Sequence, residues 1–182
     1  MFPRALFRHC PSCGGKLPPT SAGNHLACEA CGFLYYFNPA VAVAGFVFGP
    51  DGRALFIRRA KEPAKGRLAL PGGFVDFDET AEEALRRETR EEVNLDPTDL
   101  RFLCTQTNSY HYSGVTYPVL DLFFTARVAD GAPAAALDGV AGFDWEDPRA
   151  VPLELIAFPS IRNALVLLRE RWPTAAPWCQ AS

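Results

Sequence analysis

Three glutamates lie within five positions of one another near the middle of the chain, at Glu88, Glu91 and Glu92. At about 100° per residue, an α-helix would bring them into an arc of roughly 100° on one side. Like charges three and four positions apart repel by a few tenths of a kcal/mol per pair. The stretch is therefore either a solvated helix face or a set of carboxylates that holds a hard divalent cation, which prefers oxygen ligands.

A glycine loop just before these acids favours the second interpretation. Gly72 and Gly73 follow a proline, and glycine lets the backbone approach a ligand closely. A free carbonyl oxygen there could serve as a further ligand atom. A glycine loop, a helix N-terminus and three carboxylates within about twenty residues form a much narrower combination than the acids alone.

The helix that must carry the acids is marked at both ends. Thr80 and Glu83 have the spacing of a capping box, in which each side chain caps the backbone of the other. Asn94 can adopt the left-handed conformation that ends a helix, and Pro97 follows. The sequence therefore predicts a helix over Ala81–Val93.

This region resembles the signature of the Nudix hydrolases, which ends in an Arg-Glu pair, a Glu-Glu pair, a glycine and an apolar residue. Two positions differ: Thr89 replaces an apolar residue and Asn94 replaces the last glycine, and neither changes a charge. The matching positions are Gly73, Glu79, Arg87, Glu88, Glu91, Glu92 and Leu95.

The resemblance implies an α+β fold, the α/β/α Nudix sandwich, and hydrolysis of a nucleoside diphosphate linked to another group with Mg²⁺ or Mn²⁺. Glu88 and Glu92 would be the main ligands, Glu91 a further ligand, and the Gly73 carbonyl would complete the set. These three glutamates are the implied catalytic residues, and Arg87 would pair with Glu79 as support. Candidates for the general base are Glu91, Asp138, Asp144 and Glu146.

Two C-x-x-C pairs near the N-terminus predict a zinc site. Four thiolates complete the tetrahedral coordination of structural zinc, whereas two redox dithiols would not need this paired arrangement. The basic residues around the pairs are few, so nucleic acid is not an expected partner. The predicted zinc ligands are Cys10, Cys13, Cys28 and Cys31.

A four-cysteine ribbon followed by the Nudix signature is similar to the zinc-ribbon branch of the family, which includes NADH pyrophosphatases. The Ser-Gln-Pro-Trp-Pro-Phe-Pro block of those enzymes is absent, and "TQTNSYHYSGVTYPVLDLFF" stands in its place. We expect a ribbon over residues 1–38, a Nudix domain over 39–175 and a tail over 176–182.

Other elements follow from hydrophobic periodicity and turn residues. A last short strand is expected at "FDWED", and a helix whose apolar face runs from Ile161 to Trp172 is expected to end before Pro173. The expected strands are Val41–Phe48, Ala54–Arg58, Phe102–Thr107 and Val119–Val128.

Four residues are candidates for substrate binding, each with a structural alternative. Arg58 and Arg59 could meet phosphates or lie in a solvated segment. Tyr110 and Tyr112 could stack on a base, although aromatic residues in strands are more often core or cross-strand pairs.

Composition narrows the class of protein. A chain of 182 residues with formal net charge −3 forms one main domain with a small appendage and has no general attraction for polyanions. No apolar run could span a bilayer and the first residues do not form a secretory signal, so we expect a cytoplasmic location. The expected partner is a small nucleotide, namely an ADP-ribose-like, dinucleoside polyphosphate or NAD(H)-type compound. A homodimer is compatible, and the alternative function is a nucleotide-sensing or partner-binding module without turnover.

Overall fold

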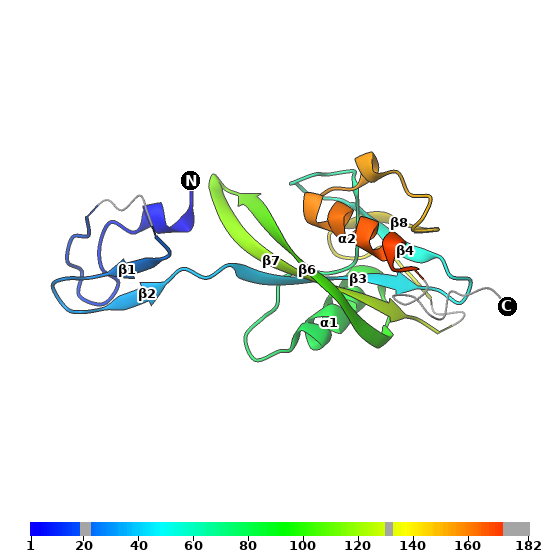
Figure 1. Cartoon of the computed structure of the whole chain (residues 1–182), viewed down its shortest axis with the longest axis horizontal. Helices are drawn as coiled ribbons and strands as arrows, with labels where there is room; N and C mark the ends of the chain where they lie inside the picture. The colour runs from blue at the N-terminus through cyan, green and yellow to red at the C-terminus, as the bar shows by residue number, and fades with distance from the viewer. Residues whose placement is uncertain (19–22, 130–132, 173–182) are drawn as a thin grey trace. The chain divides into compact units, whose positions relative to one another are not determined.

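The computed structural model describes residues 1–18, 23–129 and 133–172. Its contacts divide the chain into two compact units (Figure 1). The ribbon unit comprises Met1–Ala40 and Ser109–Val119, and the sheet unit comprises Val41–Asn108 and the described part of Leu120–Ser182. The predicted boundaries at residues 38 and 175 stay predictions, and the predicted tail lies outside the described residues.

The ribbon unit is built from short elements around a small core. The 3-10 helix η1 (Pro3–Leu6) precedes two antiparallel strands, β1 (His25–Ala27) and β2 (Leu34–Tyr36). Residues Ser109–Val119, which come from a hairpin later in the chain, also belong to this unit. The Thr116 N–H of this hairpin donates to the Met1 carbonyl at 2.7 Å. The buried apolar cluster of this unit consists of Cys10, Leu17, Leu26 and Cys28.

Six strands form one mixed sheet. The strand order is β5-β4-β3-β7-β6, and β8 pairs with β4 in antiparallel register. The strands are β3 (Ala40–Phe48), β4 (Ala54–Arg59), β5 (Leu68–Ala69), β6 (Thr98–Tyr112), β7 (Val115–Arg127) and β8 (Val140–Glu146).

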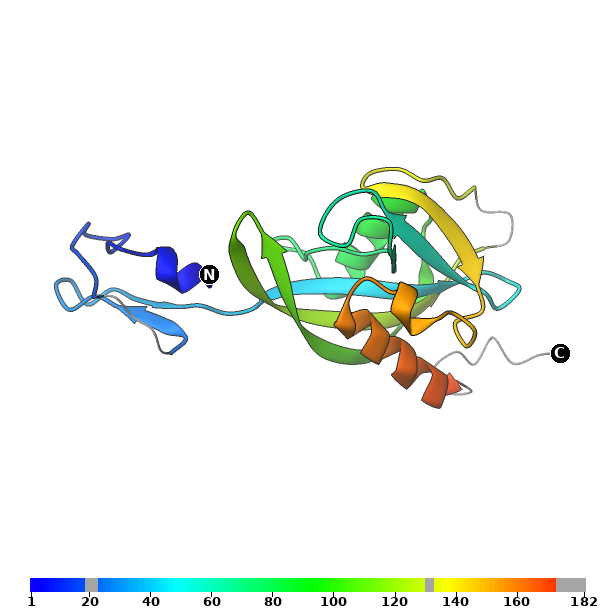
Figure 2. The ribbon, with the colours of Figure 1, turned by 90° about the horizontal axis from the view of Figure 1, so that it is seen from above.

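Two helices cover opposite faces of this sheet (Figure 2). Successive side chains of a strand point to opposite faces, and in β7 Phe123 packs in the cluster of α2 (Pro159–Glu170) while Phe124 packs in that of α1 (Ala81–Val93). A 3-10 turn, η2 (Leu153–Leu155), precedes α2. The predicted α/β/α sandwich is confirmed.

The approach of α1 to the sheet depends on a missing side chain. A Cβ on Gly45 would lie 3.0 Å from both methyl groups of Leu85, so a larger residue at this point of β3 would require the Leu85 side chain to shift. The helix that carries the three glutamates packs closely on the sheet at this glycine.

The strands β6 and β7 are longer than the sequence predicted. The polar stretch between the two predicted strands is the end of a hairpin, and its turn residues Ser113 and Gly114 have φ values of 47° and 78°. Two consecutive positive φ angles are typical of the turns that suit hairpins. Among the described helices, none combines the length and the apolar character needed to cross a membrane.

Candidate active site and metal centre

Both ends of α1 are fixed as the sequence predicts. The Glu83 N–H donates to the Thr80 hydroxyl at 3.2 Å, and the Thr80 N–H donates to the Glu83 carboxylate at 2.7 Å. At the other end Asn94 has φ 56° and ψ 34°, and its side-chain amide donates to the Pro133 carbonyl at 3.1 Å. Asn94 therefore performs the turn expected of glycine and adds a hydrogen bond that glycine could not make.

The other departure from the signature, Thr89, is fully buried. Its hydroxyl donates to the Leu85 carbonyl one turn earlier at 2.6 Å. Because the polar atom is satisfied within the helix, the methyl group can occupy an apolar position without leaving an unpaired donor. The substitution leaves the charges of the signature unchanged.

The glycine loop is tied to both β3 and α1. The Gly73 carbonyl accepts the Val43 N–H at 2.8 Å, and the Gly72 N–H donates to Glu92 Oε2 at 3.0 Å. Gly72 has φ 146°, and a Cβ there would lie 2.1 Å from the Val43 carbonyl oxygen. The Gly73 carbonyl was expected to be free, but it accepts this backbone hydrogen bond and keeps a second lone pair for a ligand.

The Glu88 carboxylate packs directly against Gly73. A Cβ on Gly73 would stand 2.3 Å from Glu88 Oε1, so the carboxylate occupies the space that any side chain there would need. The Glu88 side chain is 18% exposed. Burial raises the pKa of Glu88, although its bond to Arg87 acts in the opposite direction.

Glu92 is the most strongly perturbed acid of the helix. Burial raises its pKa from 4.5 to about 8, and the negative charges of Glu88 and Asp138 act in the same direction. The Gly72 N–H and the charge of Arg59 oppose this shift. A carboxyl group in such surroundings would be stabilised as an anion by a nearby cation.

Arg87 supplies the positive charge at the centre of the acids. Its Nη2 donates to Glu79 Oε1 at 2.6 Å and its Nε to Glu79 Oε2 at 3.2 Å, so the predicted pair is present and bidentate. Its Nη1 donates to Glu88 at 2.8 Å and to Glu91 at 3.3 Å, and Nη2 also reaches the Phe74 carbonyl at 3.0 Å. These bonds raise the pKa of Arg87 and lower that of Glu79.

The glutamates have the chemistry of a divalent-cation site. In the described part of the chain, the only group of three or more candidate ligands whose atoms all lie within 4.8 Å is formed by cysteines, so the three glutamates are not gathered that tightly. Arg87 holds Glu88 and Glu91 in this arrangement. The partly desolvated carboxylates and the glycine loop against Glu88 nevertheless fit a hard cation, whose ligands are carboxylate and carbonyl oxygens.

The four predicted zinc ligands converge in the ribbon unit. Their Sγ atoms lie within 4.8 Å of one another, and the Cys10–Cys31 and Cys13–Cys28 sulfur pairs are each 3.7 Å apart. Tetrahedral zinc with Zn–S bonds of about 2.3 Å places its sulfur ligands about 3.8 Å apart. The cluster is therefore of the right size for one zinc ion.

The predicted phosphate-binding arginines make other contacts. Arg58 pairs with Asp144 at 2.9 Å. Arg59 donates to the Pro63 carbonyl at 2.8 Å and lies over the Phe158 ring at 5.0 Å. Tyr110 and Tyr112 belong to the ribbon unit, whereas the glutamates belong to the sheet unit.

Among the candidates for the general base, Asp138 lies in the segment that contacts the acidic helix. The Leu137 N–H donates to the Glu92 carbonyl at 2.9 Å, and Asp138 itself pairs with Lys61 at 3.0 Å. Asp144 is occupied by its ion pair with Arg58.

Asp121 is a buried acid that was not predicted from the sequence, and it is 8% exposed in β7. The Asn108 amide donates to its carboxylate at 3.0 Å, and burial raises its pKa. An aspartate inside the apolar run of a strand was the available indication in the sequence.

Comparison with known proteins defines the family of the chain. The model of the NUDIX domain matches residues 38–168, so the protein belongs to the Nudix family. It is similar to the "ADP-ribose pyrophosphatase" of Methanocaldococcus jannaschii, with 52% identity over 65 residues, which are 36% of this chain and 38% of that protein. It is also similar to the "NAD-capped RNA hydrolase NudC" of Chromobacterium violaceum, with 32% identity over 169 residues, covering 90% of this chain and 60% of that protein.

The fold has a counterpart among solved structures. A NUDIX hydrolase from Nitrosomonas europaea superposes with a TM-score of 0.67 at 24% identity and covers 90% of this chain and 91% of that one. This likeness concerns the fold. The chain spans 38% and 60% of the lengths of the two relatives named above.

Proposed function

We propose that the protein is a hydrolase that splits the diphosphate of a nucleoside diphosphate derivative, with Glu88 and Glu92 as ligands of a divalent cation. The observation that supports this most is the packing of both carboxylates against the glycine loop. Glu92 accepts the Gly72 N–H at 3.0 Å, and Glu88 fills the space beside Gly73. Two desolvated acids on one helix face are costly for a fold unless a cation uses them.

Magnesium or manganese bound there would neutralise charge on the diphosphate oxygens while water attacks a phosphorus. The protein's own residues prepare this site before substrate arrives. Arg87 fixes the loop that bears Glu79 against α1, and its bond to Glu88 orients that carboxylate. Glu91, which is more exposed than Glu88, could accept a proton from water, and Asp138 is the second candidate.

The substrate class rests on the relatives. Those named above act, by their names, on ADP-ribose and on NAD-capped RNA. Both compounds contain a diphosphate joined to an adenosine ribose, and we infer that this chain accepts a nucleotide of that kind. We further propose that the cysteine cluster holds a structural zinc ion, because four thiolates leave no position open for water.

The test is to incubate the zinc-loaded protein and Mg²⁺ or Mn²⁺ with ADP-ribose, NADH, a dinucleoside polyphosphate and NAD-capped RNA, and to measure the mononucleotide products. Glu88→Gln and Glu92→Gln should each lower kcat by at least about 100-fold, because each removes a charged ligand of the reacting complex. Glu82→Gln is the control, since Glu82 is an exposed residue of the first turn of the same helix. Full activity in both site variants would refute the assignment.

The alternative is a nucleotide-sensing module without turnover. The complete set of signature acids favours the enzyme, because a sensor does not need charged ligands for a catalytic cation. Tight binding of ADP-ribose with no product from any substrate in the presence of Mg²⁺ or Mn²⁺ would favour the sensor instead.

A further inference from the structure

The ribbon unit contains a cavity that the cysteine site and the acidic helix do not use. Its volume is about 650 Å³, within the range of roughly 300–1,000 Å³ that is usual for small-molecule sites. All of the residues that line it belong to residues 1–40 and 109–119, so it lies within one compact unit. The cavity is therefore separate from the proposed hydrolytic site.

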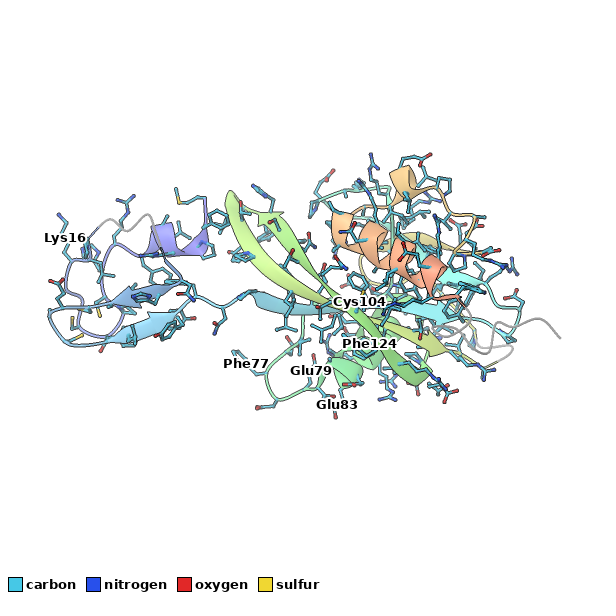
Figure 3. All side chains as sticks on the ribbon, viewed as in Figure 1. Lys16, Phe77, Glu79, Glu83, Cys104 and Phe124 are labelled. Atoms are coloured by element: carbon cyan, nitrogen blue, oxygen red, sulfur yellow. The ribbon has the colours of Figure 1, made fainter. Side chains whose placement is uncertain are left out.

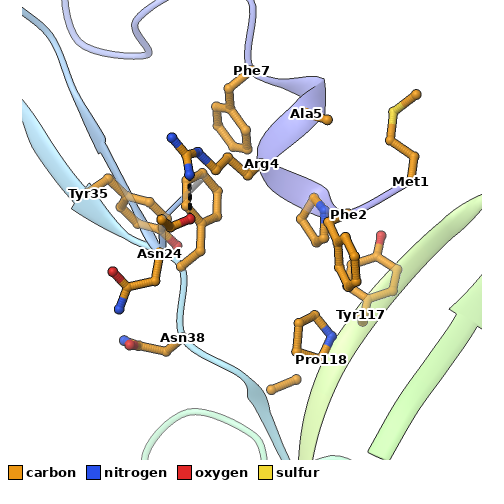
Figure 4. Close-up of a pocket in the computed structure, with 14 residues that line it drawn as sticks. Met1, Phe2, Arg4, Ala5, Phe7, Asn24, Tyr35, Asn38, Tyr117 and Pro118 are labelled. Atoms are coloured by element: carbon orange, nitrogen blue, oxygen red, sulfur yellow. Dashed lines mark hydrogen bonds between the residues drawn. The ribbon is translucent and has the colours of Figure 1, made fainter. Parts of the chain in front are cut away.

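Five aromatic rings line the cavity. In Figure 4, Phe7 and Tyr35 lie on one side of the cavity and Phe2 and Tyr117 on the other. Phe37 joins the first group, with ring centroids 5.2 Å from Phe7 and 5.1 Å from Tyr35, both edge to face. Such packing holds the rings in place while leaving their other faces available to a ligand.

These rings are exposed to solvent to an unusual degree. Phe2, Phe7, Tyr35 and Tyr117 are each at least 36% exposed; the first two flank η1 on either side, and the others come from β2 and β7. A contiguous group of exposed aromatic rings around a cavity is typical of a ligand-binding or interaction site. Planar ligands suit it, because an aromatic ring can stack on each wall.

Two side-chain amides stand at the same cavity. Asn24 and Asn38 line it, and within the described parts of the chain neither side chain has a hydrogen bond to another residue. An asparagine amide offers a donor and an acceptor side by side, which matches the edge of a nucleobase. An apolar side chain of a protein partner would leave both amides without a ligand.

One cationic side chain, Arg4, lies at the cavity and supplies a local positive charge for a phosphate. The rest of the ribbon unit adds Arg8, Lys16 and one acid, Glu29, and a zinc ion on four thiolates would bring the formal sum of the unit close to zero, so the attraction is local to Arg4. Arg4 itself lines the cavity and donates to the Gly23 carbonyl beside it. The ligand favoured by rings, amides and positive charge together is a nucleobase that carries phosphate.

We propose that this cavity binds a nucleobase with its phosphate, as a site additional to the acidic helix. The base stacks against Tyr35 and its neighbours, and the asparagine amides pair with its edge. The ligand is either a free nucleotide or a base within single-stranded RNA, since both present the same chemistry. The proposal does not depend on hydrolysis, because it concerns binding alone.

The test uses the full, zinc-loaded chain labelled with ¹⁵N. AMP and a short single-stranded RNA without a diphosphate are titrated separately, and the shifts of the backbone amides are followed. Binding should move the amides of Asn24, Tyr35, Phe37 and Asn38 in a saturable way. Saturation by AMP identifies a mononucleotide site, and saturation by RNA alone identifies a strand-binding site.

Variants of β2 make the test specific. Tyr35→Ala should weaken binding by about tenfold, which is within the range for losing one base-stacking ring, while Tyr35→Phe should keep the affinity. Tyr36→Ala is the matched control, because Tyr36 is the next residue of the strand, is similarly exposed and does not line the cavity. Equal weakening by Tyr35→Ala and Tyr36→Ala would overturn the proposal.

Two other results would overturn it as well. One is that neither ligand moves the cavity amides, or that only amides around Gly72 and Glu92 respond. The other is that the cavity amides shift with protein concentration instead of with ligand, which would show that a second copy of the chain covers the rings. Loss of hydrolytic activity alone would leave this binding unchanged and would refute only the proposed function.

Discussion

Glu92→Gln should stabilise the fold at alkaline pH even though it removes a residue of the proposed active site. Burial raises the pKa of Glu92 from 4.5 to about 8. Between these two values the folded protein keeps a proton that the unfolded chain releases. The unfolded state therefore binds fewer protons, and the free energy of unfolding falls as pH rises.

The size of the effect follows from this window. Each pH unit lowers the free energy of unfolding by at most about 1.4 kcal/mol, so the loss across the window is at most about 5 kcal/mol. The contribution is intact below pH 4.5 and fully lost above about pH 8. Glutamine cannot ionise, so Glu92→Gln should lose much less stability over the same range.

Urea unfolding followed by tryptophan fluorescence, at pH 5 and pH 8 without added divalent cation, measures this difference. Glu91→Gln is the control, because Glu91 lies on the same helix with its side chain 56% exposed. Saturating Mg²⁺ should restore stability to the wild type at pH 8, by about 2.7 kcal/mol at one hundred times its Kd, and should restore little to Glu92→Gln. Equal pH dependence in wild type and Glu92→Gln would refute the reasoning.

Three further predictions concern the loop, the arginine and the ribbon. Gly73→Ala should cost about 1–3 kcal/mol in urea unfolding and abolish turnover, because its Cβ would meet a carboxylate at 2.3 Å; Gly142→Ala, with open space around its Cβ, should stay within about 0.5 kcal/mol of wild type. Arg87→Lys should weaken Mg²⁺ binding by about 10- to 100-fold in calorimetry, because lysine cannot make the bidentate bond to Glu79; unchanged affinity would contradict its positioning role. Cys28→Ser should remove zinc, measured by metal analysis, and the NMR signals of the ribbon unit should lose their chemical-shift dispersion while those of the sheet unit persist; retained stoichiometric zinc would argue against the cysteine site.

Local rules were enough to predict α1, because each of its ends depends on residues within a few positions. The capping box at Thr80 and the left-handed turn at Asn94 place it at Ala81–Val93, as expected. The convergence of the cysteine pairs was also predictable, since their spacing has few other uses. The fold class followed from the family resemblance.

Features that depend on contacts between distant segments could not be predicted. The bond from Val43 to the Gly73 carbonyl and the engagement of Arg59 with Phe158 join residues from separate elements. The hairpin end around Ser113 was also missed, because its residues are polar and alternate little. The rings that line the cavity in the ribbon unit come from four separate segments, so no short sequence motif predicts it.

The hydrogen bond between Met1 and Thr116 bears on whether the ribbon can be moved to another protein as a separate segment of chain. The ribbon unit is not a continuous piece of chain, because it includes eleven residues from the end of the β6–β7 hairpin, Ser109–Val119. A gene fusion that transplanted only residues 1–40 would leave the Thr116 N–H without its carbonyl and the cavity without Tyr117. An exchangeable module must therefore carry both the ribbon and the hairpin end.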